Sequence, residues 1–209
     1  MSIKSNIESI ASTLRKGCRL IAVSKTHPAS LVQEAYDGGQ RIFGENKVQE
    51  MVSKYEELPK DIQWHLIGHL QTNKVKYIAE WVSLIHSVDS VKLAEEIDKQ
   101  GRKFGRVIPV LLQVYIAKEE TKFGFDREEL LSFLKNNNLK NISIEGLMGM
   151  ASNTDNIDQV REEFKGLHDL FNEIGNLKEL SMGMSGDYQI AMEEGSTLVR
   201  IGTAIFGKR

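Results

Sequence analysis

Short apolar runs alternate with amphipathic segments along almost the whole of this 209-residue chain. The apolar runs are nearly continuous, as they are in strands that are buried on both faces of a sheet. A segment with helical period follows almost every run, which indicates repeated strand–helix units and a parallel sheet. Eight such units predict an α/β fold that closes into one (β/α)8 TIM barrel, and a doubly wound open sheet is the alternative.

The apolar period and the helix-breaking residues give the expected bounds of these units. Strands are expected at 19–24, 41–43, 62–67, 82–86, 107–115, 142–148, 178–183 and 197–201. Helices are expected at 3–16, 30–38, 47–57, 71–80, 90–104, 126–135, 157–174 and 187–194. No linker, low-complexity tract or proline-rich break interrupts the chain, so residues 1–209 are expected to form a single domain.

Charge and composition argue against several classes of function. The chain carries 27 basic and 29 acidic residues, and its net charge of −2 gives no reason to expect nucleic-acid binding. The single cysteine, Cys18, allows neither an internal disulfide nor a cysteine metal cluster. Residues 1–6 carry no apolar signal core and no stretch approaches the length of a membrane span, so we expect a cytoplasmic protein without membrane contact.

The first strand ends in a lysine. Parallel barrels place functional side chains at the carboxyl ends of their strands, so Lys25 is expected to point from the rim into the mouth. Its amine can attack an aldehyde and form an imine. An ordinary lysine has a pKa of about 10.4, so about one in 2,500 is neutral at pH 7 unless burial or a cation lowers that pKa. Further lysines follow other strand ends, at Lys47, Lys74, Lys118 and Lys122. A solvated rim lysine is the alternative interpretation of Lys25.

The last two strands predict a phosphate site. Loops after the seventh and eighth strands of such barrels often bind phosphate together with the amino end of a short helix. Ser185 offers a hydroxyl there, and Gly202 and Thr203 offer backbone amides. Arg200 adds charge-assisted hydrogen bonds worth roughly 1.5–3 kcal/mol each. Together with Lys25, these donors predict a ligand that carries both an aldehyde and a phosphate.

Two histidines and the cysteine give weaker signals. His65 and His69 are four residues apart, a spacing that suits a metal pair on one helix face. They straddle a strand end and no third ligand is evident, so a structural histidine is favoured and no metal site is predicted. Cys18 precedes the first strand, at the end of the barrel opposite the mouth, which makes it a poor nucleophile candidate.

The second strand and two glycine-containing segments also reach the mouth. Asn46 is expected to line the mouth, whereas Glu45 is expected to cap the next helix. The segments 146–150 and 181–185 read GLMGM and SMGMS, and both end a predicted strand. A glycine at that point allows either a ligand or the protein backbone to approach closely.

Seven segments match the motifs of one known family in the same order. They read AVSK at 22–25, FGEN at 43–46, WHLIGHLQTNK at 64–74, ETKFG at 120–124, EGLMGM at 145–150, SMGMS at 181–185 and GSTLVRIGTAIFG at 195–207. Together they resemble the pyridoxal phosphate homeostasis protein family, which comprises single-domain relatives of the alanine racemase N-terminal barrel without its second β-domain. The resemblance runs from about residue 19 to the C-terminus.

The resemblance implies a barrel, usually monomeric, that binds pyridoxal 5′-phosphate (PLP) as an internal aldimine on Lys25. The phosphate contacts that it implies are Ser185, Arg200, Gly202 and Thr203. Asn46, His65 and Met148 resemble positions that line the cofactor pocket. One departure is Tyr115, which stands where the family usually has asparagine, and this puts any polar role of that asparagine in doubt.

The resemblance further implies a carrier that buffers PLP, delivers it to PLP-dependent apo-enzymes and affects amino-acid and keto-acid balance. No robust catalytic activity and no catalytic residue are expected. A weakly active racemase-like enzyme is the alternative, although we expect no room after strand 197–201 for the second domain that racemases use. An aldolase acting on sugar phosphates is disfavoured, because its lysine usually lies on a late strand. A second PLP site on Lys118 or Lys122 stays open.

Overall fold

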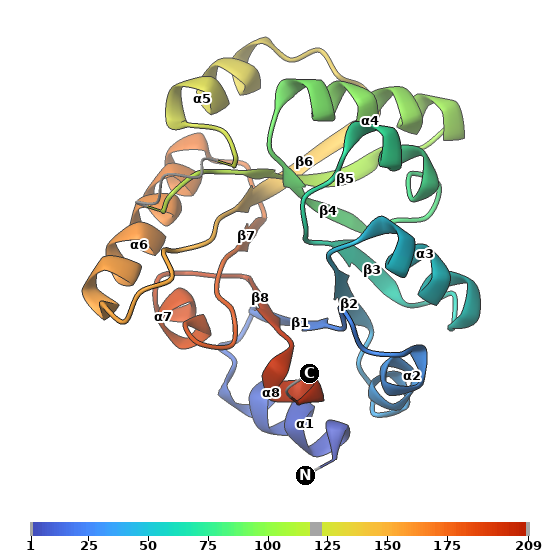
Figure 1. Ribbon diagram of the computed structural model, residues 1–209. Helices are drawn as coiled ribbons and strands as arrows, with labels where there is room; N and C mark the ends of the chain where they lie inside the picture. Colours follow the sequence, from blue (N-terminus) through green and yellow to red (C-terminus); the bar gives the residue numbers. More distant parts are fainter. Residues whose placement is uncertain (1, 118–122, 208–209) are drawn as a thin grey trace.

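The computed structural model describes residues 2–117 and 123–207 (Figure 1). Within those residues, eight strands form a closed parallel barrel in chain order, and β1 pairs with β8. The strands are β1 Arg19–Val23, β2 Ile42–Glu45, β3 Gln63–Leu66, β4 Leu84–Val88, β5 Ile108–Gln113, β6 Ile142–Met148, β7 Glu179–Ser181 and β8 Leu198–Ile201. The predicted (β/α)8 barrel is therefore confirmed, and the open sheet is wrong. Lys118 and Lys122, where a second PLP site was left open, lie outside the described residues.

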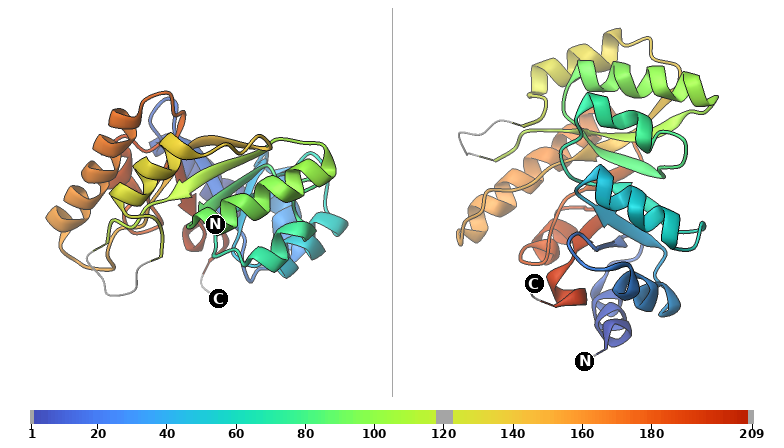
Figure 2. Two further views of the ribbon diagram at one scale, coloured as in Figure 1. Left: turned by 90° about the horizontal axis from the view of Figure 1, so that it is seen from above. Right: turned by 45° about the vertical axis from the view of Figure 1, so that its right-hand side comes forward.

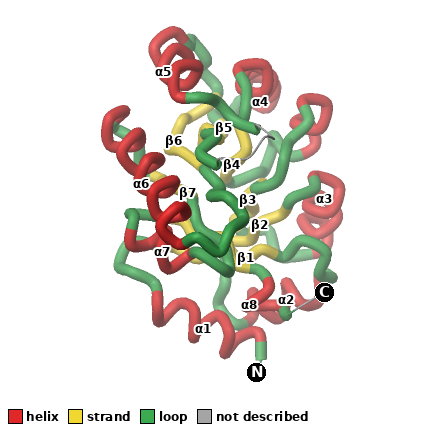
Figure 3. Tube along the Cα trace, turned by 60° about the vertical axis from the view of Figure 1, so that its left-hand side comes forward, coloured by secondary structure: helices red, strands yellow, loops and turns green. Residues whose placement is uncertain are grey.

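The helices form a layer around the strands, as the red helices and yellow strands of Figure 3 show. They are α1 Ile3–Thr13, α2 Ala29–Asp37, α3 Val48–Glu57, the 3₁₀ helix η1 Thr72–Tyr77, α4 Val91–Phe104, α5 Arg127–Asn136, α6 Ile157–Ile174, α7 Tyr188–Glu193 and α8 Thr203–Phe206. Local signals set several of their ends. Asp126 and Glu129 form a capping box at the start of α5, and Gly105 ends α4 in the left-handed conformation.

Most of the expected bounds differ from the observed ones by a few residues, and three differences have a clear local reason. The fourth strand starts at Leu84 because the Val82 amide donates to the Ile78 carbonyl at 2.8 Å, which leaves Val82 in a turn. The helix expected at 71–80 is the short 3₁₀ helix η1. Helix α8 was not expected, since four residues are too few to show a helical period.

Apolar side chains fill both faces of the sheet, which explains the continuous apolar runs in the sequence. Inside the barrel, Ile42 packs against a cluster of buried residues, Ile21, Leu84, Leu111, Met148 and Leu198. Outside it, a larger cluster that includes Phe43, Trp64 and Phe164 fills the space between strands and helices. None of the described helices is long and apolar enough to cross a membrane.

Helix α8 follows β8 and is held against α1, near both ends of the chain (Figures 1 and 2). The side-chain amide of Asn6 donates to the carbonyl of Ile205 at 2.9 Å. The ring of His27 packs on that of Phe206, with 5.1 Å between their centroids. These contacts from two other segments fix the place of α8 at the rim of the barrel.

The repeated glycine segments serve packing between protein atoms. A Cβ on Gly149 would lie 2.7 Å from Leu167 of α6, and a Cβ on Gly183 would lie 2.6 Å from Ala191 of α7. Gly183 also has a φ of +94°, which side-chain-bearing residues rarely adopt. Of the two interpretations of these segments, close packing at the rim is the one that the structure supports.

We expect Gly146→Ala to lower the free energy of unfolding by about 1–3 kcal/mol or more. The pairing of β6 with β5 skips Glu145, and a Cβ on Gly146 would then lie 1.7 Å from the carbonyl oxygen of Glu179. Urea denaturation measures the effect. The matched control is Gly166→Ala in α6, where a Cβ would meet no atom within 4 Å. This substitution should raise the free energy of unfolding by up to ~1 kcal/mol. Equal effects of the two substitutions would contradict this account.

Candidate functional site

A cleft of about 330 Å³ opens at the carboxyl ends of the strands. It is lined by Val23, Lys25, His27, Asn46, Ile67, Met150, Met184, Ser185, Gly186, Arg200, Gly202, Thr203 and Gly207. The structure thus brings together six of the eight predicted site residues, Lys25, Asn46, Ser185, Arg200, Gly202 and Thr203. They come from the ends of β1 and β2, from β8 and the start of α8, and from the loop after β7.

The charge of the cleft favours an anion. Lys25 and Arg200 lie in its wall, and no Asp or Glu is among the described residues that line it. A concave site walled by one sign of charge concentrates ligands of the opposite sign. The cleft is therefore suited to a ligand that carries negative charge.

Lys25 is half-buried in a tight turn directly after β1. The Ser24 amide donates to the carbonyl of Gly44 at 3.1 Å, which continues the pairing of β1 with β2 to the start of the turn. The His27 amide donates to the carbonyl of Ser24 at 3.1 Å and closes the turn. Thr26 has a φ of +66°, a left-handed conformation that is a real outlier for a β-branched residue. The lysine therefore sits in a turn whose backbone is fixed on both sides.

Hydroxyl and amide donors occupy another part of the cleft wall. Ser185 is exposed in the loop after β7, where the Met184 amide donates to the Asp187 carboxylate at 2.5 Å and shapes the loop. Gly202 caps α8, and the first amides of a helix have no acceptor inside it. A Cβ on Gly202 would lie 2.9 Å from the carbonyl oxygen of Val23, so glycine lets α8 start close to β1.

Arg200 lies on the inner side of the cleft and is 4% exposed. Its Nη1 donates to the carbonyl and hydroxyl oxygens of Ser181 at 2.9 and 2.6 Å, and its Nη2 donates to the carbonyl of Gly149 at 3.1 Å. Burial lowers the pKa of the guanidinium to about 10, so it remains charged at pH 7. Three of its five N–H groups are thus used by the ends of β6 and β7.

A series of hydrogen bonds leads from Arg200 through Ser181 to two buried histidines inside the barrel. His86 Nδ1 lies 2.9 Å from Ser181 Oγ, and His86 Nε2 lies 3.0 Å from His65 Nδ1. A guanidinium can only donate, so the Ser181 hydroxyl accepts from Arg200. In the other two contacts, the tautomers of the rings decide which nitrogen donates. Neutral imidazoles can make both contacts, so Arg200, Ser181, His86 and His65 form one connected chain.

Burial is the main reason that both rings are neutral. It lowers the pKa of His65 to about 3, with a smaller contribution from Arg19. It lowers the pKa of His86 well below its ordinary value, and electrostatic interactions with His65, Arg200 and Arg19 lower it further. A neutral imidazole can accept on one nitrogen while it donates on the other, as this arrangement requires.

The remaining predicted residues lie elsewhere. His65 and Met148 are buried inside the barrel and are not among the residues that line the cleft. His69 instead contacts Asp89 at the rim, with 3.0 Å between Nδ1 and Oδ2. Among the described residues, no group of three or more His, Cys, Asp or Glu could hold a metal ion. Burial raises the pKa of the half-buried Cys18.

The prediction for Glu45 is wrong. Its side chain does not cap α3 but lies fully buried between β2 and α3, where Lys54 Nζ donates to it at 2.7 Å.

Tyr115 lies in a second hollow of about 230 Å³, and Met150 and Met184 line both this hollow and the cleft.

Sequence reasoning missed several residues at this end of the barrel. Met150, Met184 and His27 line the cleft, and His86 and Ser181 support Arg200 from below. A usable signal existed for the last two, because His86 is an ionisable residue within a strand and Ser181 is a polar residue at the end of one. Met150 and Met184 stand in the glycine-containing segments 146–150 and 181–185, but nothing local showed that both line the cleft, because that depends on which loops meet.

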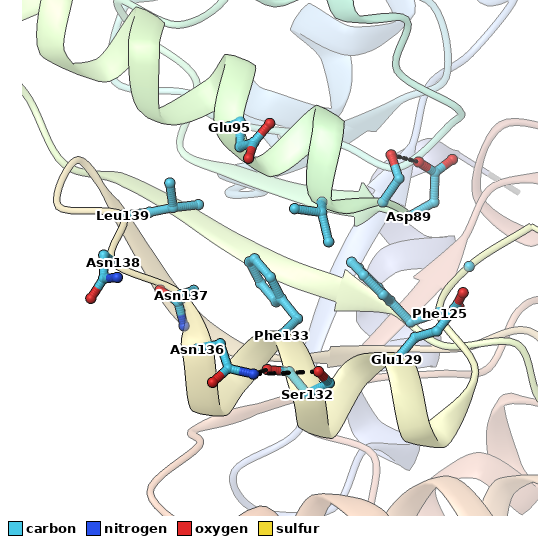
Figure 4. Close-up of a pocket in the computed structure, with 13 residues that line it drawn as sticks. Asp89, Glu95, Phe125, Glu129, Ser132, Phe133, Asn136, Asn137, Asn138 and Leu139 are labelled. Atoms are coloured by element: carbon cyan, nitrogen blue, oxygen red, sulfur yellow. Dashed lines mark hydrogen bonds between the residues drawn. The ribbon is translucent and has the colours of Figure 1, made fainter.

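A groove of about 850 Å³ between α4 and α5, larger than the cleft, is shown in Figure 4. None of the predicted site residues lines it. Its floor includes Phe125 and Phe133, and three carboxylates, Asp89, Glu95 and Glu129, lie along it. The negative charge of this groove disfavours a phosphate, so the smaller cleft at Lys25 is the better candidate site.

The chain has relatives among known proteins and solved structures. The family model described as alanine racemase, N-terminal domain, matches residues 1–209. A pyridoxal phosphate homeostasis protein of Aquifex aeolicus is 44% identical over 198 residues, which cover 91% of this chain and 87% of that protein. The solved structure of PipY from Synechococcus elongatus with PLP bound is 39% identical and has a TM-score of 0.90, with 99% of this chain and 100% of that chain covered.

A more distant structure shows the fold alone. An alanine racemase of Clostridium difficile has a TM-score of 0.82 at 16% identity, and the match covers 100% of this chain and 57% of the racemase chain. The barrel is therefore shared with the racemase, while nothing about activity follows from it.

We expect the free energy of unfolding of the protein without ligand to fall as the pH drops below about 6.5. The folded pKa of His65 is about 3 against an ordinary value of 6.5, so the unfolded chain binds more protons between these pH values. The stability that neutral His65 contributes is present above pH 6.5 and is lost towards pH 3. Between pH 7 and pH 5, the free energy of unfolding should fall by roughly 2 kcal/mol from this group. Urea denaturation of the wild type and of His65→Gln measures it. The variant should show a shallower pH dependence, and parallel curves would contradict the prediction.

Proposed function

Since the chain belongs to the pyridoxal phosphate homeostasis protein family, we propose that its cleft binds PLP and that the protein holds this cofactor for PLP homeostasis. One observation carries the proposal. The cleft combines Lys25 and Arg200 with hydroxyl and amide donors, and no described carboxylate lines it. An aldehyde and a phosphate on one small molecule match these two kinds of group.

The phosphate is proposed to lie against the loop after β7 and the start of α8. Ser185 supplies a hydroxyl donor, and Gly202 and Thr203 supply amides at the amino end of a helix. Arg200 was predicted as a further phosphate contact. Its hydrogen bonds to Ser181 and Gly149 hold it on the inner side of the cleft, where its charge attracts the anion.

Lys25 is proposed to hold the aldehyde as an imine. Its neutral amine attacks the aldehyde carbon, the carbonyl oxygen leaves as water, and a carbon–nitrogen double bond forms. Water or another amine reverses the step. Asn46 shares the cleft wall with Lys25 and is proposed to contact the ring of the cofactor. His65 and Met148 are proposed to support this part of the site from inside the barrel, since they do not line the cleft.

Carriage of PLP fits the site better than catalysis. Ser185 and Thr203 are exposed, so a phosphate bound to them is reached from solvent and the cofactor can leave. We propose that recipients are PLP-dependent apo-enzymes, and a cytoplasmic, monomeric protein remains our expectation. The weakly active racemase-like enzyme is the alternative that an amino-acid turnover assay tests.

We expect the purified protein to take up added PLP with a visible absorption band that borohydride reduction fixes. Lys25→Ala should lose the band, because no amine remains at that place to form the imine. Mass spectrometry of the reduced protein should locate the added mass on the peptide that contains Lys25. The matched control is Lys47→Ala, which removes an exposed lysine after β2 that does not line the cleft. A wild type that takes up no PLP would overturn the proposal.

We expect Ser185→Ala to weaken PLP binding by roughly tenfold, since a hydrogen bond to a charged phosphate is lost. Binding of pyridoxal, which has the aldehyde but no phosphate, should change little. Dissociation constants of both compounds, measured from the absorption band, make the comparison. An equal loss for the two compounds would place the phosphate elsewhere.

A further inference from the structure

A buried cluster of charges lies against the turn that carries Lys25. Lys54 of α3 donates from Nζ to Oε1 of Glu45 and to Oε1 of Glu50, both at 2.7 Å. The same Nζ donates to the backbone carbonyl of Ser24 at 2.8 Å. The cluster therefore joins the end of β2, one face of α3 and the residue before Lys25.

Burial makes this cluster costly. Glu45 is 0% exposed and Lys54 is 5% exposed. Removing an ion from water carries a large penalty, and apolar side chains of similar size often replace a buried ion pair without loss of stability. Burial raises the pKa of Glu45, while Lys54 and the Ser24 hydroxyl act against that rise. Net stability alone therefore gives a weak reason for placing these charges here.

The cluster holds both neighbours of Lys25. The Ser24 hydroxyl donates to Glu45 Oε1 at 2.6 Å, in addition to the bond from Lys54 to the Ser24 carbonyl. On the other side, the Thr26 amide donates to Glu50 Oε1 at 2.5 Å. The peptide groups on either side of Lys25 are thus fixed by side chains from two other elements of the fold.

The backbone conformation of Thr26 requires stabilisation by neighbouring groups. Its φ of +66° lies in the left-handed region, where a β-branched side chain crowds its own backbone. A strained residue keeps this conformation only where its surroundings determine it. The bond from its amide to Glu50 is a contact of that kind. Without it, Thr26 can relax to a negative φ, which turns the neighbouring peptide and changes the direction of Lys25.

We propose that Glu45, Glu50 and Lys54 are positioning residues for Lys25. They hold the turn 24–26 in a strained conformation that keeps the lysine amine in the cleft. The proposal rests on the proposed function, in which Lys25 binds the aldehyde of PLP. None of the three side chains lines the cleft, so they act through the backbone of the turn.

Glu50 is the residue to change first. Its side chain is 23% exposed, whereas Lys54→Met would leave Glu45 buried without its cation and would prevent folding. Glu50→Ala removes the acceptor for the Thr26 amide, and Glu50→Gln keeps a carbonyl oxygen at that place. We expect Glu50→Ala to slow PLP capture by about tenfold and Glu50→Gln to stay close to the wild-type rate.

Thr26→Gly separates positioning from a general structural role. Glycine adopts a positive φ without steric cost, so the turn keeps its conformation without the hydrogen bond to Glu50. In the Glu50→Ala background, we expect Thr26→Gly to restore most of the capture rate although it adds no contact. A loss of rate that Thr26→Gly leaves unchanged would overturn the proposal, and so would a wild-type rate in Glu50→Ala.

Amide hydrogen exchange of the PLP-free protein gives a readout that does not depend on the cofactor. The Thr26 amide should exchange at least about tenfold faster in Glu50→Ala than in the wild type, because its acceptor is gone. Unchanged exchange would overturn the proposal. If the wild type captures no PLP, the proposed function fails while the exchange experiment still decides the positioning. If Lys25→Ala abolishes capture and Glu50→Ala does not slow it, only the positioning fails.

Discussion

Pairing between the first and last strands is the constraint on which the site depends. Ile21 pairs with Arg200 and Ala22 with Ile201, which places the turn after β1 beside the start of α8. The lysine and the amide donors, far apart in the chain, thereby line one cleft. Because all eight strands are parallel, their carboxyl ends lie at the same rim, and the pairing of β1 with β8 closes that rim. Gly202 allows the close approach to Val23 that the pairing requires at that rim.

The inside of the barrel gives the site its charge. An apolar layer that includes Ile21 and Leu198 fills one part of the interior, and a polar set from His65 to Arg200 fills another. The bonds that hold Arg200 end on a hydroxyl and on carbonyl oxygens, none of which carries charge. Its positive charge is therefore not neutralised within that set and acts on the cleft. The two histidines stay neutral, so they orient Ser181 without adding charge.

Much of the fold and part of the site could be predicted from the sequence. Lys25, Asn46 and Gly202 follow strand ends, and a strand end has a fixed place in a parallel barrel, so their position in the cleft followed from the apolar pattern alone. Glu45 was misplaced for a physical reason. Successive side chains of a strand point to opposite faces, and the expected bounds of the second strand stopped short of Glu45, so its outward direction towards α3 was not seen.

The sequence by itself determined the eight strand–helix units, favoured their closure into a barrel and identified the residues at the strand ends. The apolar period and the chain direction are local properties and can be recognised without knowledge of any tertiary contact. The tertiary structure alone decided how Arg200 is held, that His86 meets Ser181 across the interior, and that Glu50 and the buried charges beside it hold the turn of Lys25. Those contacts join elements that are distant in the chain. They depend on strand register and side-chain direction, which no single segment of sequence specifies.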